Sequence, residues 1–467
     1  MSDLIRTIQQ DLNEFSADLH LLGSDLLAGR HPGEHPDNLG AGVMAEPTTP
    51  QAAAALVRWC VENDVPMVPQ GGRTGLVGGG VSRPGELILS TARLNGIEAI
   101  DPLARTVIVG AGVTLQALQE AAAEASLTPG IDLAARGSAT IGGMIATNAG
   151  GILAFRNGVM RHQVLGIEAV MPDGSLFSDL TRVLKVSAGP DIKQLLIGSE
   201  GAYGFITRAV LKLESFNSMR ATALVGVKDA MSALALIAHF RALPALQLEG
   251  AELMWRRYFV DSAGQRGFDL DWLEDDTAAV LLIEVSAASE AEARAALEEG
   301  LADLWETHGL TSGIVAASLD QARRFWALRE ESDFIYRLHP AAPSYDVSLP
   351  PGALDGYVAG LRDRLKAVDS GFDAYVYGHV ADGNLHISVF GEGSSDAALK
   401  EPIEDAVYTG VGECGGSFSA EHGVGLEKHR AYLVYGNPAR RALADAIKAA
   451  LDPKNLFNPG KVPYRAG

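Results

Sequence analysis

The chain has very little cysteine: Cys60 and Cys414 are the only two in 467 residues. Two thiols exclude a disulfide framework and a cysteine-built zinc or iron–sulfur site. The chain also has no excess of basic residues, because its formal net charge is −20. Without a basic stripe to neutralise phosphates, we expect no nucleic-acid partner, although a local site can still bind an anionic substrate.

Long apolar runs are missing as well. No stretch of about 18 apolar residues occurs, so we expect no transmembrane segment. The N-terminal sequence MSDLIRTIQQDLNEF predicts an amphipathic, charged helix that lacks the apolar core of a signal peptide. A cytoplasmic location is therefore the expectation.

The apolar content is nevertheless high enough for more than one core. Hydrophobic residues make up 47% of the chain, which suggests two or three compact units. The long glycine-rich stretches all fall before residue 206, and from about Ala221 strands and helices alternate in a different rhythm. We therefore expect an α+β protein with domains at residues 1–215, 216–430 and 431–467.

Local patterns predict the elements of these domains. In the first, residues 48–64 form a helix with Thr49 as N-cap and Pro50 in its first turn, and residues 114–127 form a second helix. In the second, strands alternate with helices such as residues 288–309, which suggests an antiparallel sheet covered by helices. The third is a helical C-terminal segment followed by a proline-punctuated strap.

Two histidines flank an Asp-Gly pair in YVYGHVADGNLHISVF, residues 375–390. If Asp382 and Gly383 form a two-residue hairpin turn, His379 lies directly opposite His386, with Cβ atoms roughly 5 Å apart. The other face then carries an apolar row: Val376, Gly378, Val380, Leu385, Ile387 and Val389. Such a histidine pair is either a polar surface feature or part of a metal site.

Two glycine-rich stretches offer bare backbone N–H groups. The first, QGGRTGLVGGG at residues 70–80, has neither the Lys-Ser/Thr pair of a phosphate loop nor G-x-G-x-x-G, so NTPase and ordinary nicotinamide sites are not supported. With Arg73 and Thr74 it suits a pyrophosphate, and a simple tight turn is the alternative. The second, residues 130–151, mixes small residues with short polar side chains, which suits a buried polar ligand better than a surface loop.

Four motifs closely resemble the FAD-binding fold shared by vanillyl-alcohol oxidase and p-cresol methylhydroxylase: VPMVPQGGRTGLVGGG, PGIDLAARGSATIGGMIATNAGG, IGSEGAYGFITRAVLKL and LDPKNLFNPGKV. Two more, YGHVADGNLHI and SAEHGVG, narrow the resemblance to the FAD-linked D-2-hydroxyacid dehydrogenases, the group of D-lactate and D-2-hydroxyglutarate dehydrogenases. The resemblance spans most of residues 45–465. It implies a two-subdomain FAD-binding fold, an α+β substrate domain, and oxidation of a D-2-hydroxy acid to the 2-oxo acid by hydride transfer to flavin N5.

The same resemblance implies which residues bind FAD. The backbone of residues 71–75 would cradle the pyrophosphate, Gly201 and Ile206 would flank the adenine side, and Asn458 would approach the isoalloxazine. The full set is Pro69, Gly71, Gly72, Arg73, Thr74, Gly75, Leu76, Gly137, Ser138, Gly142, Gly143, Thr147, Asn148, Gly201, Ile206 and Asn458. No histidine occurs in QGGRTGLVGG, where some relatives tether the flavin, so we expect noncovalent FAD.

Two opposed imidazoles need a third ligand to form an open catalytic metal site. SAEHGVG supplies Glu421, and the resemblance implies a divalent metal site of His379, His386 and Glu421. These ligands suit Zn²⁺, with Mn²⁺, Co²⁺ and Fe²⁺ as alternatives. A 2-hydroxy acid can chelate such a metal through its carboxylate and hydroxyl oxygens, which lowers the pKa of the hydroxyl.

The residues that would act on the substrate lie near these ligands in the sequence. His422, adjacent to Glu421, is the candidate acceptor of the hydroxyl proton, and a structural histidine is the alternative. Asn384 either donates a hydrogen bond to the substrate or stabilises the turn. Arg329, in a W-x-x-R arrangement, matches the family's carboxylate-binding arginine. A charged surface helix accounts for its neighbours Arg323, Arg324 and Arg337.

The chain departs from the 2-hydroxyglutarate branch at the positions that would read a second carboxylate. That branch typically has a lysine and a threonine where this chain has Ser344 and Asp333, and an ionised Asp333 would repel a second carboxylate. Ser187 and Pro190 likewise replace the usual Asn-Thr-Gly-Tyr. We therefore expect a monocarboxylic substrate, such as D-lactate or a larger apolar or aromatic D-2-hydroxy acid.

Three alternatives remain: a D-2-hydroxyglutarate dehydrogenase, a metal-independent FAD oxidase, and a noncatalytic flavoprotein subunit of a larger complex. The last two have no need for the two histidines together with Glu421 and His422. The sequence leaves the electron acceptor open among an electron-transferring flavoprotein, a quinone and a cytochrome. Homodimerisation occurs in the group, but no motif here indicates it.

Overall fold

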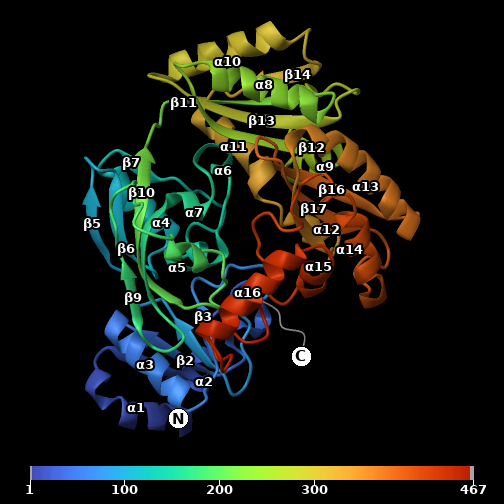
Figure 1. The fold of residues 1–467 in the computed structure, drawn as a ribbon. Coiled ribbons are helices and arrows are strands. Elements are labelled where there is room, and N and C mark those ends of the chain that lie inside the picture. Colours follow the sequence, from blue (N-terminus) through green and yellow to red (C-terminus); the bar gives the residue numbers. More distant parts are fainter. Residues whose placement is uncertain (1–2, 463–467) are drawn as a thin grey trace. The chain divides into compact units, whose positions relative to one another are not determined.

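The computed structural model describes residues 3–462, which fall into two compact units (Figure 1). Unit 1 contains the chain up to Gly151, then Asn157–Phe216, then the chain from Glu421 onward. Unit 2 contains Ile152–Arg156 and Asn217–Ala420. Residues 421–430, grouped with the second domain in the sequence division, thus belong to unit 1.

Unit 1 begins with a four-stranded mixed sheet in the order β1–β2–β4–β3. Strands β2, β4 and β3 are parallel, so a crossover must join β2 to β3, and helix α3 makes it. As predicted, Thr49 caps α3 by accepting a hydrogen bond from Ala52 N at 3.2 Å, and Pro50 occupies the first turn. The elements are α1 (Asp3–Asp11), β1 (Leu19–Gly23), α2 (Ser24–Leu27), β2 (Val43–Pro47), α3 (Pro50–Glu62), β3 (Met67–Gln70) and β4 (Leu87–Ser90).

The second sheet of unit 1 is antiparallel, in the order β5–β6–β10–β8–β9 with β7 also paired to β10. Helix α5 packs against β10 and β6, and its N-cap Thr140 accepts a hydrogen bond from Gly143 N. The elements are β5 (Ile97–Asp101), β6 (Thr106–Gly110), α4 (Leu115–Ala123), β7 (Leu127–Pro129), α5 (Ile141–Thr147), α7 (Met160–Gln163), β8 (Val164–Val170), β9 (Leu176–Asp179), β10 (Phe205–Ser215), α15 (His429–Val434) and α16 (Pro438–Leu451). Helix α6 (Ala154–Asn157) starts in the Ile152–Arg156 stretch of unit 2 and ends at Asn157 of unit 1.

Unit 2 is built on one seven-stranded sheet in the order β14–β11–β13–β12–β16–β17–β15, with every neighbouring pair antiparallel. Helices α8 and α10 cover one face, and α9 and α11 cover the other (Figure 1). This is the antiparallel sheet predicted for the second domain. The elements are β11 (Arg220–Val227), α8 (Ala230–Ala242), β12 (Gln247–Trp255), α9 (Arg256–Arg266), β13 (Ala279–Ser286), α10 (Glu290–Leu304), β14 (Leu310–Val315), α11 (Leu319–Glu330), α12 (Phe334–Leu338), β15 (Ser344–Ser348), α13 (Leu354–Val368), β16 (Asp373–His379), β17 (Asn384–Phe390) and α14 (Lys400–Tyr408).

The β16–β17 hairpin is present, but the predicted two-residue turn is wrong. The turn has four residues, 380–383, and Tyr377 rather than His379 lies opposite His386. The cause is a contact outside the hairpin: Leu349 N donates to Gly383 O at 3.0 Å, and a Cβ on Gly383 would meet Leu349 O at 1.9 Å. The register moves by two residues, so both histidines keep the same face and the apolar row is buried as expected.

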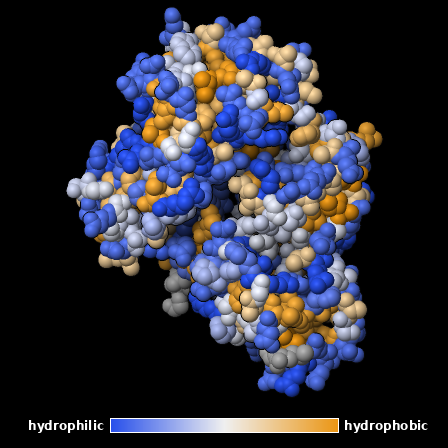
Figure 2. Space-filling view, turned by 180° about the vertical axis from the view of Figure 1, so that it is seen from behind, coloured by the Kyte–Doolittle hydropathy of each residue, from blue (hydrophilic) through white to orange (hydrophobic). Residues whose placement is uncertain are grey.

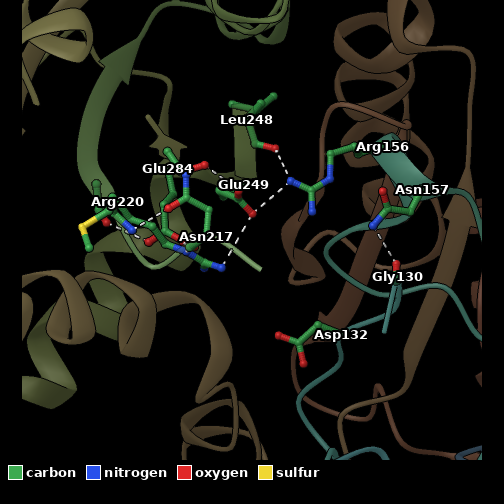
Figure 3. Close-up of polar contacts among 12 residues, drawn as sticks. Gly130, Asp132, Arg156, Asn157, Asn217, Arg220, Leu248, Glu249 and Glu284 are labelled. Carbon is green, nitrogen blue, oxygen red and sulfur yellow. Dashed lines mark hydrogen bonds and ion pairs between the residues drawn. The ribbon is translucent and has the colours of Figure 1, made fainter. Parts of the chain in front are cut away.

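Arg156 anchors the short stretch Ile152–Arg156 in unit 2 (Figure 3). Its guanidinium donates to Glu249 at 3.0 Å and to Leu248 O at 3.1 Å. Arg220 also approaches the Glu249 carboxylate, at 3.7 Å. The buried Glu249 on β12 is therefore shared by two arginines.

The surface in Figure 2 is largely hydrophilic, with hydrophobic side chains in separate groups. Scattered exposed apolar side chains are ordinary for a globular protein. Within residues 3–462, no helix combines the length and the apolar character needed to span a membrane.

Candidate active site

A cavity of about 360 Å³ in unit 1 is lined by the glycine-rich stretches, a size typical of ligand sites. Glu421 and His422 also line it. Most residues predicted to bind FAD meet here: Pro69, Gly71, Gly72, Arg73, Thr74, Gly75, Leu76, Gly142, Gly143, Thr147, Gly201 and Ile206. The remaining four do not line the cavity: Gly137, Ser138, Asn148 and Asn458.

The glycines at positions 71 and 72 are required by packing between two stretches of backbone. A Cβ on Gly72 would meet Ser138 O at 1.8 Å, and one on Gly71 would meet Thr140 Oγ1 at 2.4 Å. Ser138 therefore lies behind the loop, and its carbonyl marks where the two stretches touch. The sequence predicted that the backbone of this loop approaches a ligand closely. At Gly71 and Gly72 part of the close approach is to another stretch of the same chain.

Asn148 and Asn458 also have structural contacts. Asn148 ends helix α5 in the left-handed conformation, with φ +53°, and its Oδ1 accepts from Arg161 N at 3.0 Å. Asn458 Nδ2 donates to Glu200 O at 2.7 Å and to Gly79 O at 3.0 Å. Asn458 thereby ties the C-terminal strap to two stretches that line the cavity.

Polar atoms at the cavity suit a polar cofactor. Gln70 Oε1, Arg73 Nε and Thr91 Oγ1 are buried without a hydrogen-bond partner among the described residues, and all three residues line the cavity. The Oδ1 atom of Asn458 is likewise buried without a hydrogen-bond partner among the described residues. Buried polar atoms are almost always paired in proteins. Four in one region, one of them on a guanidinium, fit the hydrogen-bonding groups and negative charge of FAD.

Glu200 holds the loop that carries Glu421 and His422. Its carboxylate accepts hydrogen bonds from Val424 N at 3.2 Å and from Gly425 N at 3.3 Å. Successive backbone N–H groups of this kind form a concave anion site. A Cβ on Gly423, the residue before Val424, would meet Glu200 Oε1 at 2.3 Å, so a glycine is needed for the Glu200 carboxylate to approach this loop.

Burial raises the pKa of Glu200 to about 7, although Gly425 N–H, Val424 N–H and Lys428 oppose the increase. The folded protein thus binds this proton more tightly than the unfolded chain does. The resulting stability is present below the ordinary value of 4.5 and is lost as the pH rises through about 7. From pH 5 to pH 8, wild type should lose roughly 2.5 kcal/mol relative to Glu200→Gln, which cannot ionise. Chemical unfolding of both proteins at the two pH values measures this, and parallel changes would contradict it.

Glu421 contacts a second cavity stretch. One of its carboxylate oxygens accepts a short hydrogen bond from Gly151 N, at 2.5 Å. Gly151 has φ +88°, and a Cβ there would meet Asp132 O at 2.0 Å, so only glycine suits this position.

In unit 2, His379 and His386 lie together at the turn end of the β16–β17 hairpin. Their ring centroids are 5.5 Å apart at an angle of 81°. His379 is buried, and its Nδ1 lies 2.6 Å from Glu252 Oε1. Glu252, on β12, is opposite His379 in the β12–β16 register and is fully buried. Because Glu252 occupies Nδ1, Nε2 is the His379 atom that suits a metal.

Arg329 shares the same carboxylate. Its Nε lies 2.7 Å from Glu252 Oε2, and its guanidinium carbon lies 4.8 Å from the centre of the Tyr377 ring. Burial by itself would raise the pKa of Glu252, but His379 and Arg329 outweigh this and lower it. Arg329 is 7% exposed. In contrast, the arginines predicted to lie on a charged surface are exposed: Arg323, Arg324 and Arg337.

Asn384 is also buried near the hairpin turn. Its side-chain Oδ1 has no hydrogen-bond partner within the described chain. The turn is instead stabilised by Asp382 Oδ1, which accepts from Asn384 N at 3.2 Å. This favours the substrate-binding alternative for the Asn384 amide over the turn-stabilising one.

The two positions that depart from the 2-hydroxyglutarate branch have partners of their own. The Ser344 hydroxyl lies 2.9 Å from both Tyr336 Oη and Ser388 Oγ. Asp333 forms an ion pair with Arg337, one helical turn further along the chain. Neither position offers a cation to a second carboxylate.

Sequence reasoning missed Glu200 and Glu252. Each is a carboxylate among small or apolar residues, in GSEGAYG and LEGAELM, where a buried acid needs a partner. An acidic residue in such a segment was the signal in the sequence that could have identified Glu200 and Glu252. Its meaning depended on partners far along the chain, 127 residues away for Glu252 and 224 for Glu200.

Known proteins are similar to most of this chain. A family model for the C-terminal domain of FAD linked oxidases matches residues 217–462, and one for an FAD binding domain matches residues 41–179. D-2-hydroxyglutarate dehydrogenase of Xanthomonas citri pv. viticola is 36% identical over 432 residues, covering 90% of this chain and 88% of that protein. The mitochondrial D-2-hydroxyglutarate dehydrogenase of Danio rerio is 33% identical over 424 residues, covering 90% and 78%. A putative mitochondrial D-lactate dehydrogenase of Schizosaccharomyces pombe is 31% identical over 430 residues, covering 89% and 80%.

Solved structures share the fold. p-Cresol methylhydroxylase with substrate bound has a TM-score of 0.74 at 16% identity, covering 99% of this chain and 98% of that one. The 4-ethylphenol oxidase from Gulosibacter chungangensis has a TM-score of 0.70 at 16% identity, covering 99% and 97%. At this identity the likeness concerns the fold alone, and the predicted fold class is confirmed.

Proposed function

Since the chain belongs to the FAD-linked D-2-hydroxyacid dehydrogenases, we propose that it oxidises a monocarboxylic D-2-hydroxy acid at a site that also holds a divalent metal ion. D-Lactate and larger apolar or aromatic D-2-hydroxy acids are the candidate substrates. The buried His379, with Nδ1 against the carboxylate of Glu252, is the observation that carries the metal proposal. A histidine held by a carboxylate in this way is the usual arrangement of a metal ligand.

The proposed ligands are His379, His386 and Glu421, each of which offers one ligand atom. Glu421 directly follows Ala420, whose N–H donates to Asp346 Oδ2 at 2.8 Å. Asp346 is paired with His386 across β15 and β17. Because consecutive Cα atoms are about 3.8 Å apart, this connectivity supports Glu421 as the third ligand. Two histidines and a carboxylate suit Zn²⁺, with Mn²⁺, Co²⁺ and Fe²⁺ as alternatives.

Bound FAD supplies the hydride acceptor, and a bound divalent cation supplies a Lewis acid at the substrate hydroxyl. We assign Arg329 to the substrate carboxylate, because it is a buried arginine that Glu252 holds in one orientation. Asn384, whose Oδ1 has no hydrogen-bond partner among the described residues, would hydrogen-bond the substrate. His422, which lines the cavity beside Glu421, would accept the hydroxyl proton.

The substrate class is tested by anaerobic reduction of the bound flavin with D-lactate, D-2-hydroxybutyrate, D-mandelate and D-2-hydroxyglutarate. A monocarboxylic acid should reduce the flavin faster, because Ser344 and Asp333 offer no cation to a second carboxylate. Clearly faster turnover of D-2-hydroxyglutarate would remove the monocarboxylic proposal. That acid is the second candidate, since the relatives in Xanthomonas citri and Danio rerio are named for it.

Ser344→Lys should raise kcat/KM for D-2-hydroxyglutarate by about ten- to a hundredfold, because a charge-assisted hydrogen bond contributes roughly 1.5–3 kcal/mol. Steady-state kinetics on both substrate classes measure the change. Ser344→Met, which adds similar length without charge, is the matched control. An equal gain in kcat/KM in both variants would show that a charge at position 344 does not bind the second carboxylate of the substrate.

The cytoplasmic location, the electron acceptor and homodimerisation stay predictions. Several relatives are named as mitochondrial, including those of Danio rerio and Schizosaccharomyces pombe.

A further inference from the structure

Five side chains of unit 2, both histidines among them, form a closed ring of contacts. Arg329 contacts Glu252, Glu252 contacts His379, and the His379 ring faces that of His386. The His386 and Tyr377 ring centroids are 5.3 Å apart, and Tyr377 lies under the Arg329 guanidinium. Glu252 is the only carboxylate in this ring, and each of its oxygens contacts a different member.

From this geometry we infer that Glu252 is a positioning residue that sets the metal affinity of the site and fixes the substrate-binding arginine at the same time. The inference rests on the proposed function, because it takes His379 as a metal ligand and Arg329 as the residue that binds the substrate carboxylate. Glu252 would accept a hydrogen bond from Nδ1–H of His379, which leaves Nε2 for the metal and makes the imidazole a stronger ligand. Its second oxygen would hold the Arg329 guanidinium by charge.

A simpler explanation is that Glu252 only neutralises a buried arginine. An unpaired buried cation is costly, and Arg329 without Glu252 would also repel a metal cation. Both explanations predict weaker metal binding when the carboxylate is lost. The two explanations predict different metal affinities when Arg329 is removed as well. Removal of Arg329 abolishes its repulsion of the metal cation but does not restore the contact between Glu252 and His379.

The experiment measures the Zn²⁺ affinity of the purified FAD-loaded protein by competition with a chelator. Glu252→Gln should bind Zn²⁺ about ten- to a hundredfold more weakly than wild type. Glu252→Asp, which keeps the charge but is too short to reach both partners, is the second variant in case Glu252→Gln does not fold. Glu249→Gln is the matched control: it lies on the same strand, is buried and is shared by Arg156 and Arg220 (Figure 3), and it should bind Zn²⁺ as wild type does.

The double variant Glu252→Gln/Arg329→Met separates the two explanations. Affinity that stays low supports Glu252 as the residue that positions His379. Affinity that returns to the wild-type value would overturn the inference, because Glu252 would then act only by neutralising Arg329. Wild-type affinity in Glu252→Gln alone would also overturn it while leaving the proposed metal site intact. Absence of stoichiometric Zn²⁺ binding by wild type would remove the metal site and this inference together.

Discussion

Replacement of His386 by alanine is expected to lower the rate constant of flavin reduction by at least about 1000-fold and to abolish stoichiometric binding of the divalent cation. A divalent cation held by His379, His386 and Glu421 would supply a Lewis acid at the substrate hydroxyl. A Lewis acid contributes several kcal/mol to such a step, and each 1.4 kcal/mol is about tenfold in rate. Rapid mixing with substrate under anaerobic conditions measures the rate constant, and elemental analysis measures the metal.

His339→Ala is the control for this prediction. His339 belongs to the same unit and stacks on Phe390 of strand β17, with ring centroids 4.4 Å apart, but it is not a proposed ligand. It should retain metal and fast flavin reduction. A His386→Ala protein that reduces its flavin at the wild-type rate would exclude a catalytic metal at this hairpin and favour the metal-independent oxidase.

His422→Gln is expected to lower the rate constant of flavin reduction by about 100- to 10,000-fold, the usual contribution of a general base. Glutamine approximates the shape of histidine but cannot accept the proton. FAD content and Zn²⁺ affinity should stay at their wild-type values, because His422 is assigned to neither. The measurement is again single-turnover reduction, together with the flavin absorption of the purified variant.

His162→Gln serves as the control in unit 1, because His162 is exposed and its Nδ1 accepts a local hydrogen bond from Val159 N at 3.1 Å. If His422→Gln loses FAD or metal along with activity, the histidine is structural. If it keeps all three, the proton acceptor is another group, and a noncatalytic flavoprotein would be favoured only if activity also required a partner protein.

Much of the fold follows from local patterns. The helix that starts at Thr49 and Pro50 was predictable because a capping hydroxyl and a proline determine a helix start within a few residues. The antiparallel sheet of unit 2 was predictable from alternating strands separated by helices. The hairpin register was not, because Leu349, a residue outside the hairpin, fixes Gly383 and lengthens the turn.

The candidate site also has parts that local sequence patterns predict and parts that depend on contacts between distant residues. The glycine-rich stretches and the His-turn-His segment are contiguous motifs, so the sequence reveals them. Glu252 and Glu200 act through partners far along the chain, His379 at 127 residues and Val424 at 224, and only the folded chain brings these groups together. The sequence identified Arg329 by its position, but the ion pair with Glu252 that buries and orients it came from the structure.

Anaerobic bleaching of the flavin absorption tests the central claim most directly. Wild-type protein is mixed with D- and L-2-hydroxy acids before chelation, after complete metal removal, and after readdition of Zn²⁺ or Mn²⁺. We predict rapid bleaching by a monocarboxylic D-2-hydroxy acid, lost after metal removal and restored when the metal is added back. Bleaching that survives complete metal removal would contradict it and leave His379 and His386 with a structural role.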